Sequence, residues 1–266
     1  MRYGPLAGRR AVRYTTREKL RPGRGYAMKR AIVIGASEGI GRALARELSR
    51  EGYALGLAAR GVQRLRELQR ELPGASRVAH LDVTRPGAAR AALDGLIRGL
   101  GGADLIVISA GVIFQDPDPW QEERTVAVNV AGFSAVFRHA FDYFSARGSG
   151  HIVGLSSVAA VRGGCGSPVY NASKAFVSSL MHGYRIRAGK AGSRILITDI
   201  RPGHVSTRML VGQRGVFWAV PVEAAARQIA EAIRKKRRRA YITPRWRLVA
   251  WAMRIVPDRL YSRFES

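Results

Sequence analysis

A glycine-rich turn between an apolar run and a helical pattern constrains the fold more than any other feature of the sequence. Residues Ala31–Ile34 are apolar and partly β-branched, and Gly35, Gly39 and Gly41 follow as an amphipathic pattern begins at Ile40. Glycine permits a tight turn and close approach of the backbone to a phosphate, and a helix N-terminus favours negative charge. The turn therefore predicts a phosphate-binding loop between a strand and a helix. The alternative is a tight strand–helix turn without a ligand.

Short apolar runs alternate with longer helical patterns along most of the chain, which is typical of parallel βαβ units. The expected strands are Ala31–Ile34, Ala54–Ala59, Arg77–Leu81, Leu105–Ser109, His151–Ser156 and Ile195–Ile200. The expected crossover helices are Ile40–Glu51, Val62–Glu71, Ala88–Gly99, Gln121–Arg147, Tyr170–Gly189 and Val222–Arg237. We therefore predict a single-domain α/β protein with a Rossmann fold, a doubly wound parallel sheet with helices on both faces.

The length of 266 residues suits one such domain, because a domain of this size buries a sufficient core. We assign residues 28–243 to it. Residues 1–27 are rich in Arg, Gly and Pro and lack periodicity, so we expect a disordered extension, with Met28 as an alternative start. A transit peptide is disfavoured, since serine enrichment and amphipathic spacing are slight. Residues 244–266 are expected to form a basic amphipathic tail.

Charge and cysteine content bear on partners and cellular setting. The formal net charge of +26 should attract nucleotides, nucleic acids or acidic lipid headgroups. No stretch approaches the roughly 18 apolar residues of a membrane-spanning helix. The single cysteine, Cys165, excludes an intramolecular disulfide and is compatible with the cytoplasm. A nucleic-acid-binding protein on a Rossmann scaffold is the alternative function, although no DNA- or RNA-binding motif accompanies the charge.

The segment Tyr170-Asn171-Ala172-Ser173-Lys174 carries the strongest chemical signal. It opens an expected helix and places Tyr170 and Lys174 one turn apart on one face. A phenol with an ordinary pKa near 10 is a poor base at neutral pH, and a nearby ammonium would lower that pKa. The pair therefore indicates an acid/base tyrosine assisted by a lysine. The alternative is an aromatic ring packed near a solvated amine.

Further motifs lie at matching intervals around this pair. Ser157 precedes Tyr170 by thirteen positions and Asn129 precedes it by forty-one. With the Gly-x-x-x-Gly-x-Gly spacing of the first turn, this set resembles the Asn-Ser-Tyr-Lys tetrad of the short-chain dehydrogenase/reductase family. The resemblance spans about residues 29–210. It departs from the family pattern where Ile108 and Ser109 replace two asparagines before Ala110.

The resemblance implies catalytic roles for the four residues. Tyr170 would exchange a proton with the substrate oxygen, Ser157 would hydrogen-bond that oxygen, and Lys174 would contact the nicotinamide ribose. Asn129 would hold a proton-relay water. The implied reaction is hydride transfer between a nicotinamide cofactor and a carbonyl or alcohol, without a metal. A catalytically silent nucleotide-sensing relative is disfavoured because all four residues are present.

The resemblance also implies the cofactor site. Ala59 stands where NAD-preferring relatives usually carry an acid, and Arg60 could pair with a 2′-phosphate, which favours NADP(H). Glu38 stands where many NADP-binding relatives carry a basic residue, so NAD(H) stays open. Besides the tetrad members Asn129, Tyr170 and Lys174, the expected cofactor-binding residues are Gly35, Ser37, Glu38, Gly39, Ile40, Gly41, Arg60, Asp82, Val83, Ala110, Gly111, Pro202, Gly203, Val205 and Thr207.

The sequence says less about substrate and partners. The segment Arg208–Val220 is expected to set substrate preference, and its apolar residues predict an apolar substrate; the alternative is a lid packed on the domain. These apolar residues are Met209, Leu210, Val216, Phe217 and Trp218. By resemblance, the helices at Gln121–Arg147 and Tyr170–Gly189 would form a homo-oligomer.

The C-terminal region suggests a second kind of contact. The basic run Arg234–Arg239 is followed by Trp246 and Trp251 among arginines, a pattern that suits an anionic membrane surface. The alternative is a tail packed on its own domain.

Overall fold

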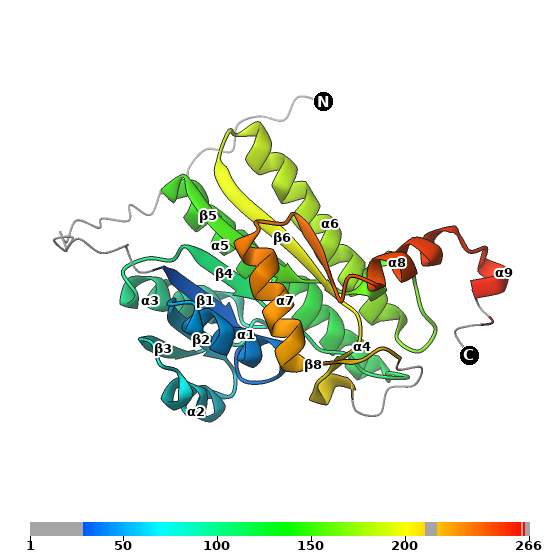
Figure 1. Ribbon diagram of the computed structural model, residues 1–266, viewed down its shortest axis with the longest axis horizontal. Helices are drawn as coiled ribbons and strands as arrows, with labels where there is room; N and C mark the ends of the chain where they lie inside the picture. Colours follow the sequence, from blue (N-terminus) through cyan, green and yellow to red (C-terminus); the bar gives the residue numbers. More distant parts are fainter. Residues whose placement is uncertain (1–28, 211–216, 262, 264–266) are drawn as a thin grey trace.

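A seven-stranded parallel sheet forms the centre of the computed structural model, which describes residues 29–210, 217–261 and 263. The strand order is β3-β2-β1-β4-β5-β6-β9, and every neighbouring pair is parallel (Figure 1). The predicted Rossmann fold is therefore confirmed. The strands are β1 Arg30–Ile34, β2 Ala54–Ala59, β3 Ser76–His80, β4 Leu105–Ile108, β5 Ser149–Leu155, β6 Arg194–Pro202 and β9 Arg239–Ile242.

Two apolar cores cover the two faces of the sheet. One face is covered by α1 (Gly39–Arg50), α2 (Val62–Glu71) and α7 (Val222–Arg234), whose buried residues form one cluster with β1 and β2. The other is covered by α3 (Pro86–Gly99), α5 (Phe133–Arg147) and α6 (Pro168–Lys190). Burial on both faces explains why the central strands are apolar at almost every position. In Figure 1, α7 crosses the near face of the sheet.

The helix expected at Gln121–Arg147 is not one regular α-helix. It begins as α4 (Pro119–Thr125), capped by Asp118, whose carboxylate accepts the backbone N–H of Gln121 at 2.8 Å. A π-helical segment, Val126–Gly132, then leads into α5. The sequence prediction was wrong on this point, because wider turns do not alter hydrophobic periodicity enough to be recognised. The π-helical segment contains Asn129.

The C-terminal region adds a strand to the sheet and packs two short helices after it. Strand β9 was not predicted, since its residues directly follow the basic run and only Ile242 is buried. Helix α8 (Trp246–Ile255) then packs Trp246, 2% exposed, against Val158, and α9 (Asp258–Tyr261) follows. Two-residue strands β7 (Val205–Ser206) and β8 (Val220–Pro221) pair in parallel. Residues 1–27 and Val216 lie outside the described residues.

Candidate active site

A cavity of about 1250 Å³ lies at the carboxyl ends of the central strands. It extends from the glycine turn after β1, past the segments that follow β4 and β5, to α8. In open α/β sheets this edge is where ligands bind, because the loops that leave neighbouring strands diverge there. The residues expected from the sequence to bind a cofactor line this one cavity, except Gly41 and Asn129, which are buried beside it.

The glycine turn is built so tightly that side chains would not fit. Gly35 has φ +90°, and a Cβ there would lie 2.6 Å from the backbone nitrogen of Ala110. A Cβ on Gly41 would lie 2.1 Å from the carbonyl oxygen of Gly35. The N-cap of α1, Glu38, makes no side-chain capping bond. The first turn of α1 thus presents its N–H groups and dipole at the cavity edge, as a phosphate site requires.

Three arginines border the cavity beside this turn. Arg60 is exposed at the end of β2. Arg64, on α2, donates to the carboxylate of Glu38 at 2.7 Å, and a nitrogen of Arg208 lies 3.9 Å from the same carboxylate. The charge of Glu38 is therefore offset at this edge of the cavity, because two arginines lie near its carboxylate. The sequence analysis missed Arg64. The signal for it was its place in the first turn of α2, four residues after Arg60.

Asp82, one of the expected cofactor-binding residues, lines the cavity and also closes a turn. Its Oδ1 accepts from the backbone nitrogen of Thr84 at 2.9 Å and from the hydroxyl of Thr84 at 2.7 Å. Burial acts to raise the pKa of this carboxyl, but these bonds and the charges of Arg60 and Arg124 outweigh it, and the pKa is lowered. Asp82 does not cap α3, since Arg85 is the N-cap there.

Asn129 fixes the backbone after β4. Its Oδ1 accepts the N–H of Val112 at 2.9 Å, and its Nδ2 donates to the carbonyl of Val112 at 2.8 Å. A Cβ on Gly111 would lie 3.2 Å from Nζ of Lys174 and 3.3 Å from Oδ1 of Asn129. The small residues Ala110 and Gly111 therefore leave room beside both side chains. Asn129 is fully buried, with its amide occupied by protein groups.

Tyr170, Ser157 and Lys174 converge in the middle of the cavity. Ser157 follows β5 and lines the cavity with Tyr170; its hydroxyl donates to the carbonyl of Pro202 at 3.4 Å and accepts the N–H of Ala159 at 3.1 Å. Lys174 lies one turn along α6, with Nζ 5.5 Å from the centre of the Tyr170 ring. The lysine ammonium donates to the carbonyl of Leu155 at 3.2 Å. The predicted one-turn spacing thus brings the phenol and the ammonium into one site.

Burial dominates the protonation of both groups. It raises the pKa of Tyr170 to about 12, against the lowering effect of the hydrogen bond with Ser157. Burial also lowers the pKa of Lys174 to about 8, against the opposing charge of Asp199. At neutral pH the site therefore holds a neutral phenol and an ammonium. In the protein without a cofactor, burial therefore has the largest effect on the phenol pKa.

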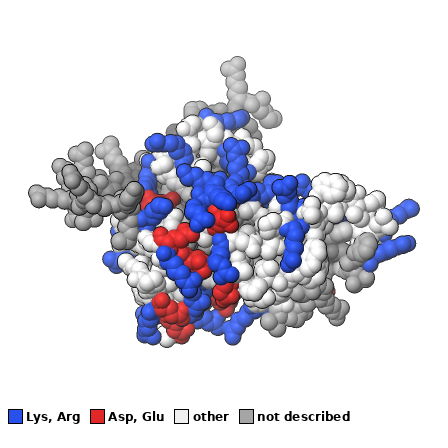
Figure 2. Space-filling model, viewed as in Figure 1, with Lys and Arg blue, Asp and Glu red and all other residues white. Residues whose placement is uncertain are grey.

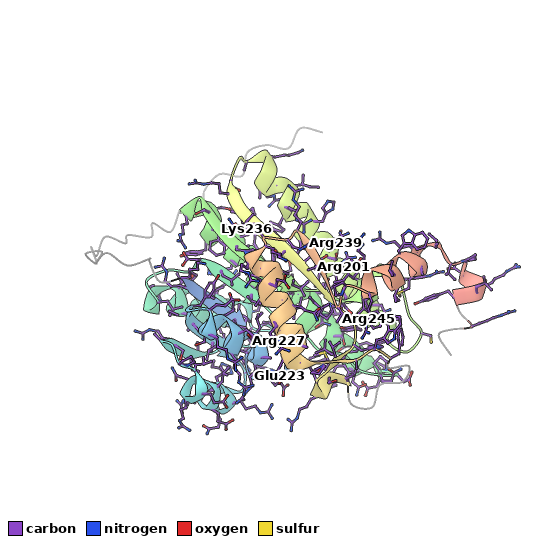
Figure 3. The ribbon with its side chains drawn as sticks, viewed as in Figure 1. Arg201, Glu223, Arg227, Lys236, Arg239 and Arg245 are labelled. Atoms are coloured by element: carbon purple, nitrogen blue, oxygen red, sulfur yellow. The ribbon has the colours of Figure 1, made fainter. Side chains whose placement is uncertain are left out.

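A buried carboxylate lies behind the catalytic helix. Asp199, 1% exposed on β6, accepts from Ser156 and from Ser178, the latter at 2.7 Å. It also pairs with Arg201 at 2.9 Å, and a nitrogen of Arg239 lies 3.6 Å away. Figure 3 shows the two arginines beside each other on β6 and β9. The sequence analysis missed this network, because its members come from β5, α6, β6 and β9.

The far end of the cavity has an apolar wall. The rings of Phe217 and His204 stack near Trp246, with centroids 5.0 and 5.2 Å from it. A Cβ on Gly203 would lie 2.0 Å from the Trp246 ring, so the Pro-Gly element fits directly under it. Other residues that line the same cavity are Cys165, Pro202, Val205, Thr207, Met209, Leu210, Val249, Met253 and Tyr261.

Trp218 does not line the cavity, although the sequence analysis placed it with the residues that select a substrate. Its ring lies edge-to-face with that of Phe217, and the guanidinium of Arg245 lies 4.9 Å from the ring centre and donates to the Trp218 carbonyl at 3.1 Å. Figure 3 shows Arg245 at the start of α8. The sequence analysis did not name Trp246, Val249 and Met253 as cavity residues, although it gave a tail packed on its own domain as one alternative; their helical spacing of three and four was the signal.

Comparison with known proteins agrees with this geometry. The model of the short chain dehydrogenase family matches residues 29–215. An uncharacterized oxidoreductase of Mycobacterium tuberculosis strain H37Rv is 32% identical over 255 residues, which cover 90% of this chain and 98% of the relative. An uncharacterized oxidoreductase of Myxococcus xanthus is 36% identical over 186 residues, 67% and 73% of the two chains. The chain therefore belongs to the short-chain dehydrogenase family, and it is an oxidoreductase.

Solved structures share the fold. The alcohol dehydrogenase of Thermococcus sibiricus, complexed with 5-hydroxy-NADP, superposes with a TM-score of 0.68 at 25% identity, covering 78% of this chain and 91% of that one. A short-chain dehydrogenase/reductase of Burkholderia phymatum, in complex with NAD, gives 0.73 at 21% identity, covering 84% and 91%. Within the described part of the chain, no helix is long and apolar enough to cross a membrane, and no cluster of His, Cys, Asp and Glu could hold a metal.

Proposed function

We propose that this protein is an NAD(P)-dependent oxidoreductase that transfers a hydride between the cofactor and a carbonyl or alcohol substrate. The observation that carries the proposal is the convergence of Tyr170, Ser157 and Lys174 in the same cavity as the glycine turn. A phosphate site at one end and an acid/base group in the middle are what such a reaction needs from the protein. The solved relatives complexed with NADP or NAD derivatives add support.

The described residues fit a dinucleotide. Gly35 and Gly41 leave no room for a side chain, so the backbone comes close to whatever occupies the turn. Ser37, Gly39 and Ile40 line the same stretch, Thr207 approaches Gly39, and Asp82 and Val83 line the expected adenine end. When bound, the nicotinamide cofactor would supply or accept the hydride.

Tyr170 is proposed as the proton donor to a carbonyl oxygen. Its phenol is neutral at neutral pH, because burial raises its pKa to about 12. Ser157 would donate its hydroxyl hydrogen to the same oxygen, since it lines the same cavity as the phenol. The ammonium of Lys174 would stabilise the phenolate that remains after proton transfer. The free protein is thus poised for carbonyl reduction below the lysine pKa of about 8.

NADP(H) is the proposed cofactor. Ala59 offers no carboxylate to repel a 2′-phosphate, and the guanidinium groups of Arg60 and Arg64 border the cavity beside the turn. Arginine holds phosphate through a planar fork of donors. To bind the 2′-phosphate, Arg64 would give up part of its ion pair with Glu38.

An apolar substrate and self-association complete the proposal. The far cavity wall of Phe217, Trp246, Val249 and Met253 offers mostly apolar surface to a substrate. On α6, Phe176 and Ile186 are exposed, at 37% and 49%, which supports a homo-oligomer formed through this helix.

The experiment is a titration with NADPH and with NADH, followed by fluorescence of the reduced nicotinamide. We expect NADPH to bind more tightly, and Arg60→Ala to weaken NADPH by about tenfold, or 1.4 kcal/mol, while leaving NADH nearly unchanged. Arg66→Ala, an exposed arginine on α2 outside the cavity lining, is the matched control. Absence of binding by either nucleotide would refute the proposed function; equal loss of both in Arg60→Ala would refute the preference.

A further inference from the structure

Helix α8 is apolar on two opposite sides. Its inner side packs Trp246 and Ala250, both 2% exposed, against Val158, with Val249 and Met253 beside them. Trp246, Val249 and Met253 also line the cavity. Arg162 anchors the end of the helix, where its Nη1 donates to the carbonyls of Met253 at 2.8 Å and Val256 at 2.5 Å. The inner side is therefore a fixed wall of the proposed substrate site.

The outer side of α8 presents large apolar side chains to solvent. Leu248 is 71% exposed, Trp251 63% and Ile255 59%. Their spacing of three and four residues places them in one stripe along the helix. Arg247 and Arg254 are also exposed and flank this stripe, because they precede Leu248 and Ile255 by one position. We call these five residues the outer face of α8.

The charge around the outer face is positive. Asp258, the acidic residue nearest along the chain, pairs with Arg162. In Figure 2, acidic side chains gather over α1, α2 and α7, whereas the visible surface around α8 is basic or uncharged. Contact between two copies through this face would bring Arg247 and Arg254 against their own counterparts, which is unfavourable. A negatively charged, apolar surface is the complementary partner.

We propose that the outer face of α8 docks the protein on an anionic lipid membrane. A helix that lies in the interface buries its apolar stripe at the boundary between headgroups and acyl chains, which favours Trp and Leu. Its arginines contact the acidic headgroups. The inner side of the same helix lines the cavity, so the substrate site lies one helix away from the lipid. Resting on the proposed function, this assigns a lipid-soluble ketone or alcohol as the substrate class.

The experiment is co-sedimentation of the full-length protein with phosphatidylcholine vesicles, with and without phosphatidylglycerol. We expect binding that depends on the anionic lipid and falls at least tenfold in the triple variant Leu248→Gln/Trp251→Gln/Ile255→Gln. Trp120→Gln is the matched control, since Trp120 on α4 is equally exposed, at 64%, and lies outside α8. It should bind like the wild type.

The charge requirement is tested separately. Arg247→Gln/Arg254→Gln should weaken binding to anionic vesicles, whereas Arg66→Gln/Arg70→Gln, which removes the same charge from exposed positions on α2, should not. Equal binding by the triple variant and the wild type, or no binding by either, would overturn the proposal. The proposal would also be overturned if the wild type did not bind vesicles and the triple variant had a lower mass by analytical sedimentation than the wild type. The outer face would then join two copies of the chain.

Nicotinamide fluorescence in the same samples separates this proposal from the proposed function. None of the three apolar residues of the outer face lines the cavity, so the triple variant should bind the nucleotide as the wild type does. Vesicle binding without nucleotide binding would retain the docking face and refute the oxidoreductase site. Nucleotide binding without vesicle binding would retain the oxidoreductase site and refute the docking face.

Discussion

The two ends of the cavity are built in different ways. The nucleotide end is made of backbone: Gly35 and Gly41 are packed so closely that a Cβ would meet main-chain atoms. The apolar end is made of side chains, chiefly Phe217, Trp246 and Met253, from segments that meet only in the folded chain. A backbone-built site tolerates few changes, while a wall of side chains can change its shape residue by residue. This difference explains how one scaffold keeps its cofactor and varies its substrate.

The largest expected effect lies between the two ends, at the acid/base group. Tyr170→Phe removes the proton donor and leaves the ring in place. We expect turnover to fall by about 10² to 10⁴-fold, the usual contribution of general acid–base catalysis. Cofactor binding should change little, as measured by nicotinamide fluorescence. Tyr53→Phe, outside the cavity, is the control and should keep the turnover of the wild type. Full turnover in Tyr170→Phe would show that the Tyr170 hydroxyl takes no part in the reaction.

A change in the backbone-built end comes next. Gly41→Ala places a methyl group 2.1 Å from the carbonyl oxygen of Gly35, so the turn must open. We expect nucleotide affinity to fall by at least about tenfold, equivalent to 1.4 kcal/mol. Gly95→Ala, in α3 with open space around its Cβ, should leave affinity unchanged. Unchanged affinity in Gly41→Ala, with the melting temperature of the wild type, would contradict a backbone-built site.

The pH dependence tests the carboxylate behind the catalytic helix. The charge of Asp199 opposes the burial that lowers the pKa of Lys174 to about 8, so Asp199→Asn should lower that pKa further. Carbonyl reduction needs the ammonium, and it should therefore decline at a lower pH in the variant than in the wild type. Arg239→Gln, which removes a cation 3.6 Å from the same carboxylate, is the control and should not shift the decline downwards.

The smallest effect is expected in the side-chain wall. Val249→Ala trims a half-buried side chain on the inner side of α8, and the loss of one methyl group's contact with an apolar substrate is worth about 0.8 kcal/mol, or about fourfold. We expect KM to rise severalfold while nucleotide affinity stays constant. Leu248→Ala, on the outer face of the same helix, should change neither. A loss of nucleotide affinity in Val249→Ala would show that the two ends are not separable.

Much of this contrast could be predicted from the sequence, and the reason is physical. Strand and helix periods and the glycines at the turn are local properties, so the sheet, the tight strand–helix turn and the one-turn spacing of Tyr170 and Lys174 were predictable. The network around Asp199 and the place of Trp246 depend on segments distant in sequence, and no local pattern encodes their contact. The same holds for the pairing of Arg64 with Glu38.

The most direct test of the central claim is the ionisation of Tyr170 with and without NADP⁺. It is measured as the ultraviolet difference spectrum of tyrosinate between the wild type and Tyr170→Phe. Burial keeps the phenol pKa at about 12 in the free protein, so no signal should arise below pH 10. The positive nicotinamide ring beside the phenol should bring the ionisation below that pH. An unchanged titration in a protein that demonstrably binds NADP⁺ would contradict a nicotinamide-linked Tyr170.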